Sequence, residues 1–123
     1  MARGTSNPDF LNGVPELAVL RVLQDGPRHG YAIVQAITER TGGSLQFGEG
    51  SIYPVLHRLE QQDFVKTKRE AVGGRERIIY RLSKSGSRQL ADCSARWRNV
   101  AESIQALLEG GDNGLSPVVS PAS

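Results

Sequence analysis

The 123-residue sequence has few of the features that define several common protein classes. It has one cysteine, Cys93, which excludes an intramolecular disulfide and a cysteine-rich zinc motif. No apolar run approaches the roughly 18 residues needed to span a bilayer, and the N-terminus lacks the apolar core of a signal peptide. We therefore expect a cytoplasmic protein of one domain with appendages and no membrane partner.

Residues that suggest catalysis or metal binding are equally scarce. Scattered hydroxyl groups and two histidines do not form a recognisable nucleophile–base or carboxylate pair. For Cys93, a small buried hydrophobe is favoured over a redox or metal role, since neither histidine is close in sequence. The sequence predicts no enzyme, no cofactor and no metal site.

Net charge is low, at +2, but it is unevenly distributed. From Phe64 to Arg88, eight lysines and arginines stand against two glutamates, a net of +6, so the rest of the chain carries −4. A basic segment on an otherwise acidic chain is typical of a surface that binds a polyanion such as DNA. The alternative interpretation is a solvated, charged strand pair.

An amphipathic helix is predicted within residues 48–60, GEGSIYPVLHRLE. A proline is tolerated only near a helix start, so Pro54 places that start near Gly50 or Ser51. Apolar residues at i, i+3, i+4 and i+7 form one stripe: Ile52, Val55, Leu56 and Leu59. Polar residues that can bind phosphates and base edges form the other face: Ser51, Tyr53, His57, Arg58, Gln61 and Gln62. The pattern predicts a DNA recognition helix.

Two helices are predicted before this segment and a β-hairpin after it. The first runs from Pro15 to Asp25 and is buried on more than one side; the second runs from about His29 to Arg40. The second helix is expected to turn four residues to the core: Tyr31, Ile33, Val34 and Ile37. Residues 64–71 and 75–82 flank Val72-Gly73-Gly74 with a period of two, which predicts a hairpin with one apolar and one cationic face.

The predicted fold is mainly α with a β-hairpin: a winged helix-turn-helix of three helices and a two-stranded wing, followed by a long C-terminal dimerisation helix. Four segments are expected: a flexible N-terminal segment (1–13), the winged helix-turn-helix domain (14–83), the dimerisation helix (84–109) and a Gly/Ser/Pro-rich disordered tail (110–123). Ser83 is the expected N-cap of the last helix.

The last predicted helix carries an apolar seam with spacings of three and four: Leu90, Cys93, Trp97, Val100, Ile104 and Leu107. A helix of this length extends roughly 39 Å at 1.5 Å per residue, more than a small winged domain covers. We therefore expect a two-fold homodimer, in which Leu108, Leu17 and Leu20 also take part. Folding of the helix back onto its own chain is the alternative.

Short motifs in a fixed order resemble a known family. They are GPRHGY at residues 26–31, GSIYP at residues 50–54 with Leu56, Leu59 and Glu60, and Gly73-Gly74 before Tyr80, Leu82, Ser83 and Gly86. From about residue 14 to residue 108 the chain resembles the PadR family of bacterial transcriptional regulators, and its single C-terminal helix resembles the short subfamily. Asp63-Phe64 and Ile79 depart from the family pattern. The family usually has a glycine and a smaller aliphatic residue in place of Asp63-Phe64, and an aromatic residue in place of Ile79.

The resemblance implies a dimeric repressor that binds pseudo-palindromic operator DNA and, in many members, releases it when a small molecule binds. Tyr53 is expected to donate to a phosphate, Arg58 to read guanine, and Arg75 at the wing to contact phosphates. For His29 we favour capping of its own helix over a phosphate contact. The expected DNA-binding residues are Gly50, Ser51, Tyr53, Pro54, His57, Arg58, Lys66, Lys68, Gly74, Arg75 and Arg77.

Trp97 suggests where an effector would bind. In a symmetric dimer two copies of this indole could stack on a planar aromatic molecule, with Cys93 and Val100 beside it; a simple interface anchor is the alternative. The predicted function is a dimeric, sequence-specific DNA-binding transcriptional regulator, a repressor released by an effector at the dimer interface. The competing hypothesis is a winged-helix protein-interaction adaptor without an effector.

Overall fold

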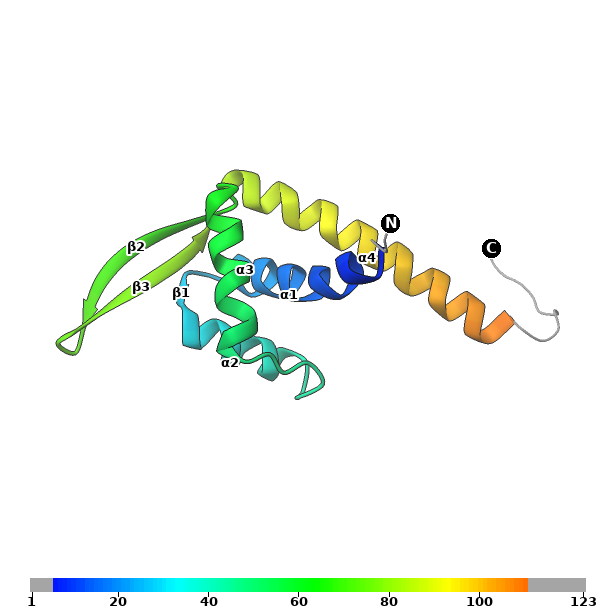
Figure 1. Cartoon of the computed structure of the whole chain (residues 1–123), viewed down its shortest axis with the longest axis horizontal. Helices are drawn as coiled ribbons and strands as arrows, with labels where there is room; N and C mark the ends of the chain where they lie inside the picture. The colour runs from blue at the N-terminus through cyan, green and yellow to red at the C-terminus, as the bar shows by residue number, and fades with distance from the viewer. Residues whose placement is uncertain (1–5, 111–123) are drawn as a thin grey trace. The chain divides into compact units, whose positions relative to one another are not determined.

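The computed structural model of the chain describes residues 6–110. Its elements follow in the order α1 (Ser6–Gln24), β1 (Arg28–His29), α2 (Gly30–Arg40), α3 (Glu49–Gln61), β2 (Val65–Val72), β3 (Arg75–Leu82) and α4 (Lys84–Gly110) (Figure 1). The chain divides into two compact units between Ala91 and Asp92, a boundary that α4 crosses. Of the predicted tail, residues 111–123 lie outside the described residues, as do residues 1–5 of the predicted N-terminal segment.

Helix α1 is longer than predicted. It begins at Ser6 and contains Pro15, which was expected to mark its start. Residues 6–13, predicted to be flexible, are therefore helical. Pro8 lies in the first turn, where a missing backbone N–H costs nothing, so the same rule that pointed to Pro15 applies earlier in the chain.

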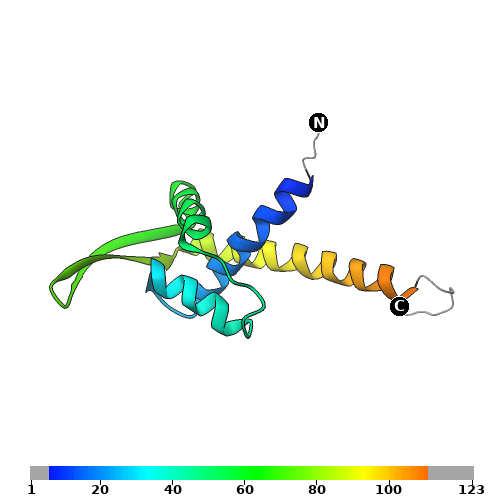
Figure 2. The same cartoon turned by 60° about the horizontal axis from the view of Figure 1, so that its bottom comes forward.

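The core of the first unit lies among α1, α2 and α3, which Figure 2 shows from a second side. All four apolar residues of the predicted stripe on α3 are buried, as that stripe predicted. On α2 the buried face is built from Gly30, Ile33, Ala36 and Ile37. Tyr31 was expected in the core, but 52% of it is exposed, because the small residues Gly30 and Ala36 occupy the face that packs.

The wing is an antiparallel pair, β2 and β3, joined by Gly73 and Gly74 as predicted. Both glycines have positive φ, +57° and +80°, which a tight hairpin turn requires. Strand β1 adds a short third strand to give the order β1-β3-β2, with His29 opposite Ile79. A strand of two residues is too short to show a period of two, so the sequence did not predict it.

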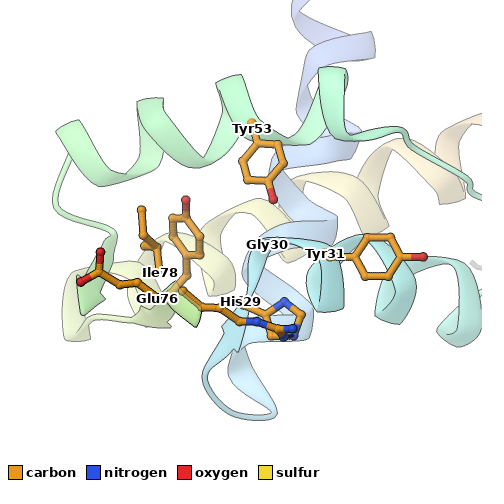
Figure 3. A pocket seen from close by; sticks show the side chains of 8 residues that line it. His29, Gly30, Tyr31, Tyr53, Glu76 and Ile78 are labelled. Carbon is orange, nitrogen blue, oxygen red and sulfur yellow. Dashed lines mark hydrogen bonds between the residues drawn. The ribbon is translucent and has the colours of Figure 1, made fainter. Parts of the chain in front are cut away.

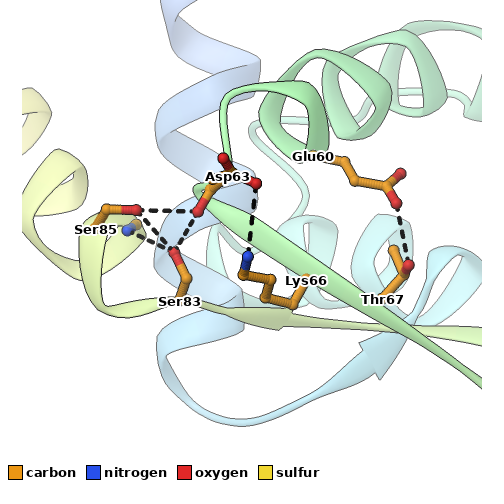
Figure 4. A network of polar contacts seen from close by, with 7 residues as sticks. Glu60, Asp63, Lys66, Thr67, Ser83 and Ser85 are labelled. Carbon is orange, nitrogen blue, oxygen red and sulfur yellow. Dashed lines mark hydrogen bonds and ion pairs between the residues drawn. The ribbon is translucent and has the colours of Figure 1, made fainter.

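The junction of α3, β2 and α4 is fixed by polar contacts (Figure 4). Asp63 has φ +64°, and the Phe64 N–H donates to the Leu59 carbonyl at 3.0 Å. Helix α3 therefore ends with a left-handed residue, at a position where the family usually has glycine. The Ser83 hydroxyl donates to the Asp63 carbonyl at 2.6 Å and accepts from the Gly86 N–H at 3.0 Å. The prediction that Ser83 caps α4 is confirmed.

The exposure of the predicted seam on α4 changes along the helix. Leu90 and Cys93 are buried, whereas Leu107 and Leu108 are 76% and 78% exposed. Leu90 and Leu20 were predicted to contact a second copy, but both are buried in the chain itself, because Leu20 completes the core among the first three helices.

Within residues 6–110, no helix is long and apolar enough to cross a membrane.

Candidate nucleic-acid interface

The exposed surface of α3 has a centre and two flanks. At 100° per residue, Gly50, Pro54, His57 and Gln61 stand opposite the buried stripe, and all four are exposed. Tyr53 and Glu60 lie on one flank, while Ser51 and Arg58 lie on the other. The helix starts at Glu49, one residue before the predicted position, with Gly48 as its N-cap.

The flank that carries Tyr53 faces the wing and the start of α2. On this flank Glu60 accepts a hydrogen bond from the Thr67 hydroxyl of β2 at 3.0 Å. In Figure 3 the Tyr53 hydroxyl points toward Gly30, while Tyr31 points away from it. Tyr53 therefore lies between two elements instead of projecting straight into solvent.

Arg58 is held on the opposite flank. Its guanidinium lies 3.6 Å from a carboxylate oxygen of Glu16 in α1, and its side chain remains 43% exposed. About 140° of helix rotation separates Arg58 from Tyr53. The two residues expected to lead DNA recognition thus lie on different flanks, and His57 is closer to the centre of the exposed face.

The cationic face of the wing is confirmed by the alternation along its strands. Thr67 and Tyr80 are paired in register and face α3, so their neighbours belong to the other face. Lys66 lies directly opposite Arg81, a like-charge pair that destabilises a sheet unless an anion compensates it. The cations on this face are Lys66, Lys68, Arg75, Arg77 and Arg81, with Glu70 as the acid among them.

Several wing cations already have partners. Arg69 pairs with Glu76 at 3.0 Å on the face toward α3, Lys68 lies 3.9 Å from Glu70, and Lys66 lies 3.5 Å from Asp63. Within residues 6–110, the guanidinium of neither Arg75 nor Arg81 makes a hydrogen bond or ion pair. Arg75 directly follows the Gly73-Gly74 turn, so an available guanidinium stands at the tip of the wing.

An open cavity of about 400 Å³ lies between the wing, α2 and α3 (Figure 3). His29 and Arg77 meet in it, with 2.9 Å between His29 Nε2 and Arg77 Nη1. His29 Nδ1 also lies 3.4 Å from the Ala32 N–H, so the predicted capping role is confirmed. Burial raises the pKa of the Tyr80 phenol, with smaller contributions from Tyr53 and Glu60. The lining residues are His29, Gly30, Tyr31, Tyr53, Glu76, Arg77, Ile78 and Tyr80.

The residues predicted to bind an effector lie on α4, in the second unit. Trp97 and Val100 are half-buried, and Cys93 is buried with its Sγ 3.5 Å from Arg96 Nη2. In the part of the chain that the structure describes, no group of three His, Cys, Asp or Glu side chains could hold a metal ion.

Sequence reasoning missed two features of this site. Gly30 lies directly against Tyr53, and His29 contacts Arg77 across 48 residues of sequence. Contacts between residues so far apart leave no mark on local periodicity. The presence of His29 and Gly30 in the GPRHGY motif was the one sign in the sequence that these two residues matter.

Comparison with known proteins agrees with this geometry. The sequence profile of the Transcriptional regulator PadR-like family matches residues 19–92. Transcriptional regulator YqjI of Escherichia coli is 32% identical over 82% of the chain, which spans only 47% of YqjI. The negative transcriptional regulator PadR of Bacillus subtilis is 28% identical over 75% of the chain and 51% of its own length.

Solved structures share the fold. A PadR family transcriptional regulator from Eggerthella lenta matches with a TM-score of 0.70 and 27% identity, over 85% of this chain and 91% of that one. The structure of Bacillus subtilis PadR in complex with operator DNA matches with a TM-score of 0.58 and 29% identity, over 63% of this chain and 44% of that one. The chain is a winged helix-turn-helix protein and belongs to the PadR-like family of transcriptional regulators.

Proposed function

We propose that this protein represses transcription by binding pseudo-palindromic operator DNA as a homodimer in the cytoplasm. The observation that carries the proposal is the combination, in one compact unit, of an exposed polar face on α3 with the available Arg75 at the wing tip. The α3 face would enter the major groove, and the wing would neutralise flanking phosphates. Bacillus subtilis PadR, a negative regulator solved with operator DNA, supports the same role.

Two groups of residues would make the contacts. Those of α3 are Gly50, Ser51, Tyr53, Pro54 and His57, with Arg58 at the flank; those of the wing are Lys66, Lys68, Gly74, Arg75 and Arg77. Arg81 lies opposite Lys66, which already has Asp63 as a partner, so the unpaired Arg81 guanidinium supports a phosphate-binding role on this face.

The apolar end of α4 supports the homodimer. Ile104, Leu107 and Leu108 are exposed on the chain alone, and they continue the seam through Trp97 and Val100. A second copy would cover them and bring a second α3 to the neighbouring turn of DNA, about 34 Å away. The alternative, a protein-interaction adaptor, gives no reason for the basic wing.

DNA selection tests the proposal. The full-length protein is used to select duplexes from a randomised 30-base-pair library, and a two-fold symmetric consensus is expected. Binding to the best selected duplex should weaken with salt along a log–log slope of about −0.9 per phosphate neutralised. Arg75→Ala, which is present in both copies of the proposed dimer, should reduce the size of that slope by about two units, whereas Arg69→Ala, whose guanidinium is paired with Glu76, should reduce it less. Equal affinity of parent and Arg75→Ala at every salt concentration would contradict the wing assignment.

An effector at Trp97 is the finer part of the proposal. A planar aromatic ligand there must favour one arrangement of the two winged domains, or it cannot change DNA affinity. Aromatic compounds that release the selected duplex should quench the fluorescence of this single tryptophan. Compounds that release DNA without quenching would place the effector elsewhere.

A further inference from the structure

We propose that His29 and Gly30, at the start of α2, are positioning residues that set where Tyr53 of α3 and Arg77 of the wing stand. The proposal rests on the proposed function, since it concerns two side chains expected at the DNA. Each residue acts through a different contact, and the two contacts meet in the cavity between α2, α3 and β3 (Figure 3).

Gly30 sets the place of the Tyr53 ring by having no side chain. A Cβ at this position would lie 2.6 Å from Cε1 and 2.7 Å from Cζ of the ring, and would overlap the hydroxyl as well. Real Cβ atoms do not approach other atoms so closely. The ring therefore packs directly on the α2 backbone, and any larger residue at position 30 must push it away.

A side chain at position 30 would displace the Tyr53 ring and no backbone atom. All three atoms nearest to that Cβ belong to the far end of one side chain, which can rotate without moving a backbone. Substitution of Gly30 should therefore move Tyr53 and leave the fold intact. Gly30 itself is buried, so it offers no surface of its own to DNA.

His29 sets the place of Arg77 by accepting a hydrogen bond. A guanidinium only donates, so the 2.9 Å contact requires the lone pair of His29 Nε2. Capping of α2 requires the lone pair of Nδ1, at 3.4 Å from the Ala32 N–H. A neutral imidazole has one acceptor nitrogen, so the cap and the link to Arg77 are made by different tautomers of the ring, and the shorter, charge-assisted bond to Arg77 is the stronger of the two.

The first test is a double-mutant cycle between positions 30 and 53, measured as affinity for the best selected duplex. Gly30→Ala should weaken binding about tenfold, a usual coupling for residues in contact, and Tyr53→Ala should weaken it as well. In the Tyr53→Ala background, Gly30→Ala should change affinity by less than about twofold, because no ring remains to displace. Independent losses would overturn the proposal, and so would an unfolded Gly30→Ala protein, since ring rotation should spare the fold.

The second test is a double-mutant cycle between His29→Asn and Arg77→Ala, measured as affinity for the best selected duplex. Asparagine is a good N-cap but is too short to reach Arg77, so His29→Asn can cap α2 but cannot accept from the guanidinium. The two substitutions should be coupled by about three- to tenfold. Additive losses would show that His29 does not act through Arg77.

The two tests separate this inference from the function on which it rests. If Tyr53→Ala and Arg77→Ala leave DNA affinity unchanged, the proposed interface is wrong, and the positioning role falls with it. If both weaken binding but the cycles are additive, the interface stands and only the positioning role is wrong.

Discussion

Gly86→Ala is expected to destabilise the protein, because the backbone just before β2 lies directly against this glycine. A Cβ at Gly86 in the first turn of α4 would overlap the carbonyl oxygen of Phe64 and lie 3.0 Å from its carbonyl carbon. These are backbone atoms, and the same oxygen accepts the Ser83 N–H at 3.0 Å. Unlike the Tyr53 ring beside Gly30, they cannot rotate away.

The size of the effect follows from two opposing contributions. Forcing a methyl group into a packed site costs about 1–3 kcal/mol, and the upper end applies where only backbone can yield. Alanine in place of glycine in a helix raises the free energy of unfolding by at most about 1 kcal/mol. The net loss is about 2 kcal/mol, and at about 4–8 °C per kcal/mol for a domain of this size, the Tm should fall by about 8–16 °C.

Thermal unfolding followed by circular dichroism at one fixed protein concentration measures this change. Gly50→Ala is the matched control, because it also lies in a helix and nothing stands within 4 Å of its added Cβ. That control should raise stability by up to about 1 kcal/mol. A Gly86→Ala protein as stable as the parent would refute the close approach of α4 to the start of β2.

Three further predictions concern other parts of the chain. Asp63→Val should lose about 1–2 kcal/mol in urea unfolding, because a β-branched residue is strained at φ +64°, whereas Asp63→Gly should stay within about 0.5 kcal/mol of the parent. The pKa of Asp25 is lowered from its ordinary value of 3.8, first by a hydrogen bond from Arg21 and further by the charges of Arg21 and Arg40. Its carboxylate therefore stabilises the fold above about that pH, and the Tm difference between parent and Asp25→Asn should shrink as pH falls from 6 to below 3.8. If the proposed homodimer forms through the exposed apolar end of α4, Leu107→Glu should sediment as a monomer at concentrations where the parent sediments as a dimer, since it places a charge in that end; a dimeric variant would place the interface elsewhere.

Local features of the fold were predictable because they depend on residues close together in the chain. The stripe of α3, the Gly73-Gly74 turn, the left-handed Asp63 and the Ser83 cap are each set by backbone chemistry within a few residues. The start of α1 was mistaken because two prolines satisfy the same local rule, and Pro15 lies inside the helix.

Residue types and their spacing are enough to show which faces of each helix and strand are polar, cationic or apolar, and they predict the fold class and the basic wing. Packing between distant parts of the chain sets where those side chains point. It paired Arg58 with Glu16, buried Leu20, and brought His29 and Gly30 to Arg77 and Tyr53. These outcomes depend on the angles at which helices and strands pack, and packing angles follow from many contacts between distant residues, which no local period records.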